Sequence, residues 1–158
     1  MKRAVWFFTL AAAANYAALI WAGVLTLGGL KPLDLRITGY SYEDVLYYLS
    51  WLDLESAQIL TTTVRRLDTS FPILLGLALA GWLWQAVGQR RAWRFVVMVP
   101  FAYMAADLYE NHLVGEILAG ILPSAELVAR ASLMTMLKWA LLVLSFMGLV
   151  GLTTGEED

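Results

Sequence analysis

The sequence contains no cysteine. This absence excludes disulfides, thiolate metal ligands and thiol nucleophiles, and with them quinone-linked thiol redox chemistry. Histidine is almost as scarce, because His112 is the single one in 158 residues. No histidine cluster can therefore hold haem or a di-metal centre. Asp107 and Glu110 are also metal-ligand types, but helical spacing turns His112 away from both of them. We expect no metal site and no cofactor.

Charged residues are few as well, at 15% of the chain against roughly 25% in soluble domains. The net charge of -2 provides no basic field for nucleic acid, so we expect no nucleic-acid partner. The common catalytic signatures are missing too: Gly-x-Ser-x-Gly, His-Glu-x-x-His, a phosphate-binding glycine loop and a Rossmann fingerprint. The sequence therefore does not decide whether the protein is an enzyme.

Apolar residues dominate what is there, at 60% of the chain. They gather in four runs, near residues 4–30, 71–88, 95–118 and 127–152. Each run is about as long as the roughly 20 residues that cross a bilayer core. The first run also exceeds the hydrophobic region of a signal peptide, so we interpret it as an uncleaved span. The prediction is an all-α, polytopic membrane protein: one domain over 1–158, built as an up-down bundle of four transmembrane helices.

Basic residues predict the orientation of this bundle. Lys2 and Arg3 precede the first run, and the short loop 89–94 contains three arginines. Because loops rich in Lys and Arg stay in the cytoplasm, we expect both termini there. The acidic tail 156–158 would then be cytoplasmic, and the long connection 28–70 would lie on the other side of a bacterial inner membrane.

The long connection is predicted to be helical over about 41–70. Ser41 and Asp44 resemble a capping box, and an amphipathic, aromatic segment follows them. Such a helix either lies along the outer interface or simply covers the bundle. A second helix should begin near Asp53 or Ser56 and continue into the run 71–88, with a weak point at the threonines 61–63. Residues 33–40 are expected to be extended or irregular.

The run 95–118 carries ionisable groups in its outer half. Asp107, Glu110 and Asn111 share one face of the expected helix, and Tyr103 extends that face toward the cytoplasmic end. Such groups are costly in lipid, so they are candidate functional residues. His112 lies on the reverse side, where Glu116 at i+4 can pair with it.

Partners for these groups are found in the other runs. Lys138, with Thr135 on the same face, reaches a depth similar to that of Asp107, so we predict that Lys138 and Asp107 face each other. Glu110 lies nearer the outside, within reach of an arginine. The sequence does not decide which arginine faces inward. The predicted network comprises Arg65, Arg66, Asp68, Asp107, Glu110, Asn111 and Lys138, with Asn15, Tyr103 and Thr135 as secondary members. Asn15 lies among small residues of the first run, a face that serves either close helix packing alone or close packing together with an interhelical hydrogen bond from Asn15.

Three short motifs lie at these positions: Arg66-Leu67-Asp68-x-x-Phe71-Pro72, Asp107-x-x-Glu110-Asn111 and Thr135-x-x-Lys138-Trp139. Together they resemble a family of small four-helix bacterial membrane proteins without an established activity. The similarity extends from about residue 43 to residue 145. The resemblance implies a fold and a set of positions, and it implies no function.

Several functional hypotheses remain open. In the first, the protein binds a lipid-like or small amphiphilic ligand, or serves as an accessory subunit of a larger membrane complex or a homo-oligomer. In the second, Glu110 or Asp107 is the general acid or base of an intramembrane enzyme acting on a lipid-soluble substrate. In the third, the same carboxylates serve a proton-coupled carrier. Alternatively, the ionic pairs only fix the register of the helices.

Overall fold

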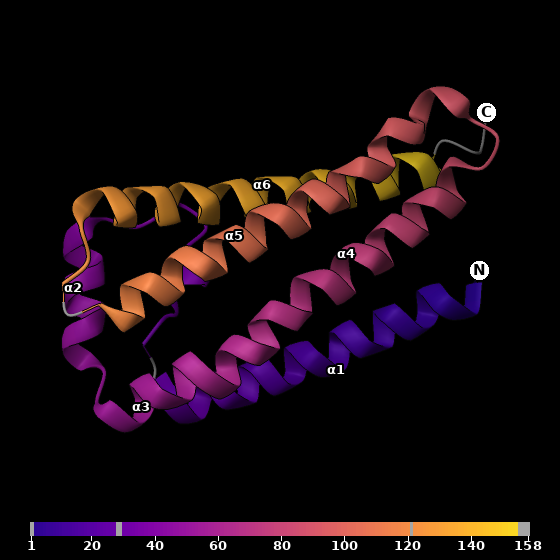
Figure 1. Ribbon diagram of the computed structural model, residues 1–158. Coiled ribbons are helices and arrows are strands. Elements are labelled where there is room, and N and C mark those ends of the chain that lie inside the picture. The colour runs from indigo at the N-terminus through magenta and orange to yellow at the C-terminus, as the bar shows by residue number, and fades with distance from the viewer. Residues whose placement is uncertain (1, 28–29, 121, 155–158) are drawn as a thin grey trace.

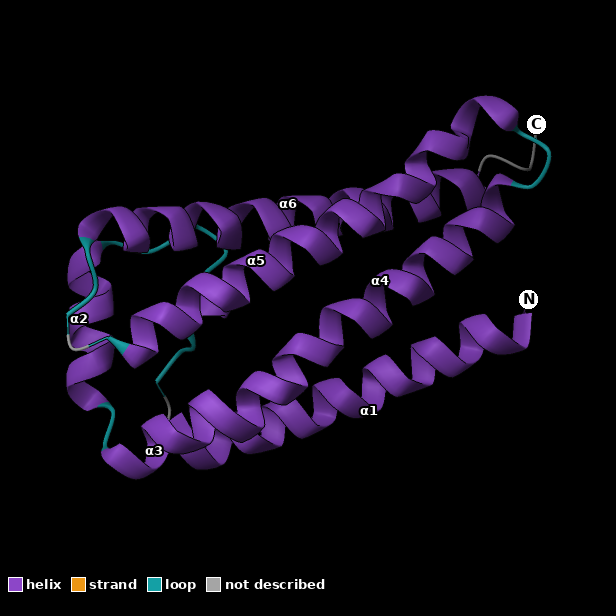
Figure 2. Ribbon diagram, viewed as in Figure 1, coloured by secondary structure: helices purple, strands orange, loops and turns teal. Residues whose placement is uncertain are grey.

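The computed structural model describes residues 2–27, 30–120 and 122–154, and all regular structure among them is helical (Figure 2). The helices are α1 (Lys2–Leu27), α2 (Tyr42–Trp51), α3 (Leu54–Ile59), α4 (Arg65–Val87), α5 (Val99–Ala119) and α6 (Ala125–Thr154). Two short 3₁₀ segments, η1 (Leu33–Leu35) and η3 (Arg91–Met98), and a π-helical turn, η2 (Leu60–Val64), complete the order. The predicted all-α class is confirmed.

The four long helices run alternately up and down (Figure 1). The start of α1 and the end of α6 lie at one end of the molecule, and α2 lies at the other. Helix α1 packs on α4, α5 packs on α6, and α4 joins the two pairs through its contact with α5. The up-down order of helices agrees with the prediction from the apolar runs.

Among the described residues, three segments are long and apolar enough to cross a membrane: Lys2–Gly23, Leu54–Val87 and Ala125–Thr154. The second is longer than the predicted run 71–88, because α3, η2 and α4 follow one another without a break. Helix α5 is not among the three, since Asp107, Glu110 and Glu116 interrupt its apolar character. The helix predicted over 95–118 also begins later, at Val99, because residues 95–98 belong to η3. The candidate membrane spans are thus α1, the continuous segment formed by α3, η2 and α4, and α6.

Side-chain caps begin the two helices of the long connection. The Ser41 amide donates to Asp44 Oδ2 (2.8 Å) and the Asp44 amide donates to Ser41 Oγ (3.1 Å), which completes the predicted capping box. The hydrogen bond that the Asp44 carboxylate accepts from the Ser41 amide lowers the pKa of Asp44. Asp53 caps α3 by accepting from the Ser56 amide at 2.7 Å. Both helix starts occur where the sequence predicted them.

The threonines 61–63, where the sequence predicted low helix propensity, lie in the π-helical turn η2. The hydroxyls of Thr61 and Thr62 donate to the carbonyl oxygens of Ala57 and Gln58, one turn earlier. Such back-bonding competes with regular α-helical geometry. A π turn changes the direction in which the following residues point, and it is often found at functional sites. Arg65 is the first residue after it.

Residues 33–40, between α1 and α2, pack into the bundle, although the sequence predicted only an extended or irregular segment there. Leu33 is buried, the Trp139 indole donates to the Asp34 carbonyl oxygen (2.9 Å), and the Tyr40 amide donates to Ser132 Oγ (2.8 Å). Gly39 turns the chain here with φ at 84°, a conformation that favours glycine. These contacts hold η1 against α6.

Helix α2 covers the end of the bundle. Val45 and Tyr48 are buried in one apolar cluster with residues of α5 and α6, whereas Tyr47 and Trp51 are exposed. The amphipathic character predicted for this segment is therefore present. The exposed aromatic face is consistent with a helix that lies along the membrane interface, and the buried face is consistent with a helix that covers the bundle.

Candidate functional site

A compact charge cluster joins α5 to α6. Lys138 Nζ lies 3.1 Å from Asp107 Oδ1 and 2.5 Å from Glu110 Oε2. Thr135 Oγ1 donates to the other Glu110 oxygen, Oε1, at 2.6 Å. All four side chains are buried, and Glu110 is 0% exposed. The predicted contact between Asp107 and Lys138 is thus confirmed, with one ammonium shared by two carboxylates.

The predicted contact between Glu110 and an arginine is wrong. Glu110 is bound by Lys138 and Thr135, and in the described part of the chain no ion pair links it to Arg65 or Arg66. Arg65 Nη1 donates instead to the Asn111 carbonyl oxygen at 3.0 Å. The Asn111 side chain in turn donates to the Asp68 carbonyl oxygen at 2.9 Å. Arg65 is therefore the arginine that faces the bundle, and Arg66 is exposed.

Gly115 makes room for the inward arginine. A Cβ atom at this position would overlap the guanidinium of Arg65. The absence of a side chain on α5 is therefore what lets Arg65 lie flat against that helix and reach the Asn111 carbonyl.

We expect Gly115→Ala to expel Arg65 and to lower the free energy of unfolding by about 0.5–2 kcal/mol. The lost hydrogen bond from a charged donor is worth about 1.5–3 kcal/mol, and the better helix propensity of alanine offsets up to about 1 kcal/mol. Denaturant unfolding of the purified protein in micelles measures the change. Gly151→Ala is the control, since nothing lies within 4 Å of a Cβ there. Equal behaviour of the two variants would contradict the role of Gly115.

The remaining predicted residues occupy distinct places. Asn15 Nδ2 donates to Ser70 Oγ at 2.5 Å, which confirms an interhelical bond between α1 and α4. Tyr103 is buried one turn before Asp107. His112 pairs with Glu116 at 3.3 Å on the exposed side of α5, as its spacing predicted, and away from the charge cluster.

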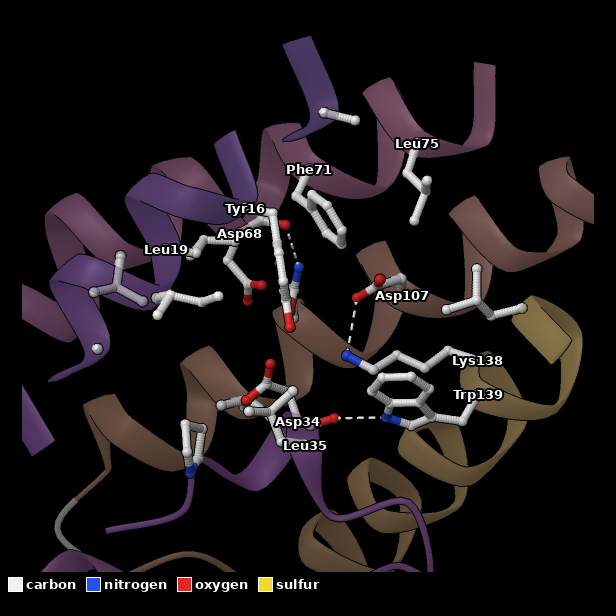
Figure 3. A pocket seen from close by; sticks show the side chains of 18 of the residues that line it. Tyr16, Leu19, Asp34, Leu35, Asp68, Phe71, Leu75, Asp107, Lys138 and Trp139 are labelled. Atoms are coloured by element: carbon white, nitrogen blue, oxygen red, sulfur yellow. Dashed lines mark hydrogen bonds and ion pairs between the residues drawn. The ribbon is translucent and has the colours of Figure 1, made fainter. Parts of the chain in front are cut away.

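A cavity of about 880 Å³ lies beside the charge cluster, between α1, α4, α5 and α6. Its acidic, basic and amide lining residues are Asp34, Arg65, Asp68, Asp107, Asn111 and Lys138. Most of the remaining lining is apolar and includes Leu19, Phe71, Leu75, Leu79, Leu142 and Leu149. Figure 3 shows Asp34, Asp68 and Asp107 approaching the same part of this space from three different elements. Glu110 is not a lining residue, so only Asp107 and Lys138 of the charge cluster face the cavity.

The cavity opens to the outside between α1 and α6. Tyr16 and Ile20 of α1 and Phe146 of α6 line it, yet each is about half exposed (45%, 51% and 47%). The outer faces of both helices carry further exposed apolar side chains, among them Trp6, Trp21, Leu144 and Met147. The mouth is therefore surrounded by apolar surface.

Asp34 is the lining residue that sequence reasoning missed. Burial raises the pKa of its carboxyl, the Lys138 ammonium opposes that rise, and Asp107 adds to it. Nearby Tyr40 is neutral, because burial raises its pKa to about 12. The sequence places Asp34 between two leucines, and that apolar setting was the only indication that Asp34 is buried. The surrounding stretch has no helical or strand periodicity.

No protein-family model, curated protein or solved structure matches this chain. The resemblance to small four-helix bacterial membrane proteins therefore stays a prediction. Functional inference rests on the geometry of the cavity and the charge cluster.

Proposed function

We propose that this chain is a four-span protein of the cytoplasmic membrane that binds a lipid-like or small amphiphilic ligand in the cavity between its long helices. The observation that carries the proposal is the cavity itself. Its volume of about 880 Å³ falls within the range of ligand sites, roughly 300–1,000 Å³. A few polar groups gather at one part of an otherwise apolar wall, which is the division that an amphiphile needs.

Burial of its ionisable groups supports α5 as the fourth span. Asp107 and Glu110 are enclosed by the bundle and paired with Lys138, so they would not face lipid. Arginines in the turn between α4 and α5, together with Lys2 and Arg3, favour the cytoplasm for the end that holds both termini. Helix α2 would then cover the opposite, extracytoplasmic end.

The lateral mouth supports entry of the ligand from the lipid phase. Tyr16, Ile20 and Phe146 would face the acyl chains, and a molecule dissolved in the bilayer could pass between α1 and α6 without crossing water. The charge cluster has a supporting part in this proposal: it joins α5 to α6 and orients Asp107 and Lys138 toward the cavity.

Native mass spectrometry of the protein extracted gently from its own membrane tests the proposal. We expect a co-purifying small molecule in the wild type and its loss in Leu75→Trp, because an indole at this lining position fills part of the cavity. Leu144→Trp is the matched control, since Leu144 is exposed on α6 and is not a lining residue. A ligand that survives Leu75→Trp, or a clean mass in the wild type, would refute binding in the cavity. A mass that includes another protein chain would favour an accessory subunit.

An intramembrane enzyme is the second candidate, and one observation favours a version of it. Asp107 lines the cavity with one carboxylate oxygen bound to Lys138, so it could exchange a proton with a bound molecule. Glu110 is a poorer choice, because both of its oxygens are held and it does not reach the cavity. Asp107→Asn would then abolish turnover of the identified ligand while leaving it bound. A proton-coupled carrier has less support, since the charged lining residues gather at one part of the cavity (Figure 3).

A further inference from the structure

The carboxylates that line the cavity outnumber the cations available to them. Lys138 is already shared between Asp107 and Glu110, and Arg65 points its guanidinium at the Asn111 carbonyl oxygen. Asp34 and Asp68 also line the cavity, and neither forms a salt bridge within the described ranges 2–27, 30–120 and 122–154. The polar part of the cavity thus has more carboxyl groups than cations to pair with them.

From this imbalance we infer that the ligand is an amphiphile with a cationic ammonium head group, held between Asp34, Asp68 and Asp107. The inference rests on the proposed function and specifies the chemical class that the same cavity takes. An ammonium supplies the positive charge that the site lacks, and its N–H or N-methyl groups can approach several carboxylates at once.

Aromatic rings around the carboxylates point to the same chemistry. Tyr16 and Phe71 stack with ring centroids 5.3 Å apart, and Trp139 lines the cavity beside Lys138 (Figure 3). The faces of aromatic rings attract cations, with Trp the strongest, and such rings together with carboxylates are a recurrent setting for ammonium ligands. Trp139 is also held in place by its hydrogen bond to the Asp34 carbonyl oxygen.

Other occupants fit less well. A phosphate or carboxylate head group would meet three carboxyl groups and would have to compete with Asp107 and Glu110 for Lys138. A small metal ion lacks a ligand set, because among the residues described no three His, Asp or Glu side chains are arranged to hold one. The apolar remainder of the cavity also needs an alkyl or isoprenoid tail to fill it.

Matched probes that share one tail test the inference: hexadecyltrimethylammonium, hexadecanol and hexadecyl sulfate. Each is titrated into the full-length protein in nanodiscs of zwitterionic lipid, and one-to-one adducts are measured by native mass spectrometry. We expect the ammonium probe to bind at least tenfold more tightly than the other two. Asp68→Asn and Asp34→Asn should each weaken the ammonium probe about five- to tenfold and leave hexadecanol unchanged.

Glu116→Gln is the control for nonspecific charge, since it removes an exposed carboxylate outside the cavity. Its ammonium affinity should equal that of the wild type. If all three probes bind with equal affinity and Leu75→Trp abolishes their binding, the inference of a cationic head group is wrong, but the cavity still binds an amphiphile. Preference for the sulfate would also overturn that inference. No binding by any probe, with no native ligand in the wild type, would remove the proposed function itself.

Discussion

Replacing Lys138 by methionine is expected to lower the free energy of unfolding by about 3–5 kcal/mol, the usual result of removing one partner from a buried ion pair. The substitution keeps an unbranched side chain of similar length but leaves Asp107 and Glu110 together without a cation. Both groups are buried, at 3% and 0% exposed, so solvent compensates little for the lost ammonium. Two carboxylates this close must then either repel each other or take up protons. Denaturant unfolding in micelles, followed by tryptophan fluorescence, measures the loss.

Neutralising all three groups together should recover most of that stability. In the triple variant Lys138→Met, Asp107→Asn, Glu110→Gln no charge is left unpaired, and the Thr135 hydroxyl can still donate to the new amide oxygen. Lys31→Met serves as the control, because Lys31 is exposed. If Lys138→Met alone unfolds like Lys31→Met, the charge cluster does not stabilise the contact between α5 and α6. If the triple variant stays as unstable as the single one, the loss comes from packing of the lysine stem.

Predictions from the sequence succeeded where local rules decide the outcome. The caps at Ser41 and Asp53 depend only on residues three positions away, and both form. Asp107 and Lys138 were matched by depth alone, because an unpaired charge inside a bundle is so unfavourable that few arrangements remain. At Asn15 the sequence left open close packing alone or an interhelical hydrogen bond, and the structure has the hydrogen bond to Ser70.

The sequence was insufficient where tertiary contacts choose between neighbouring residues. Adjacent arginines differ by about 100° on a helix, so the inward one depends on the phase of that helix. The π-helical turn immediately before Arg65 changes this phase, and the open position at Gly115 accepts the guanidinium. Glu110 and Asp107 lie one turn apart, about 4.5 Å along the axis, and a lysine side chain is long enough to reach both. Depth alone therefore did not show that Lys138 binds the two together.

Asp34 was missed for a related reason. Residues 30–41 have no period that predicts which side chains turn inward. Their position is set by bonds to α6, from Trp139 to the Asp34 carbonyl oxygen and from the Tyr40 amide to Ser132. These partners are about a hundred residues away in the chain, at separations of 105 and 92. The position of Asp34 in the proposed head-group site thus depends on a loop whose location only the folded bundle determines.

The second large effect is expected at Gly76 of α4, which packs against Met104 and Pro100 of α5. A Cβ atom there would overlap the Met104 side chain and lie 3.2 Å from the Pro100 carbonyl oxygen. We expect Gly76→Val to lower the free energy of unfolding by about 1–3 kcal/mol, the usual range for overpacking a buried contact. The same unfolding measurement applies. Gly151→Val is the control, because nothing lies within 4 Å of a Cβ at Gly151 and this residue does not line the cavity.

A second-site change separates steric overlap from a general intolerance of valine at this position. Met104→Ala removes the flexible neighbour but leaves the Pro100 carbonyl, so combining it with Gly76→Val should recover part of the stability. Because α4 and α5 both line the cavity, Gly76→Val should also weaken ligand binding, and the double variant should recover part of that affinity. Strictly additive losses in the double variant would show that the two side chains do not compete for the same space, and that α4 and α5 are held apart by other contacts.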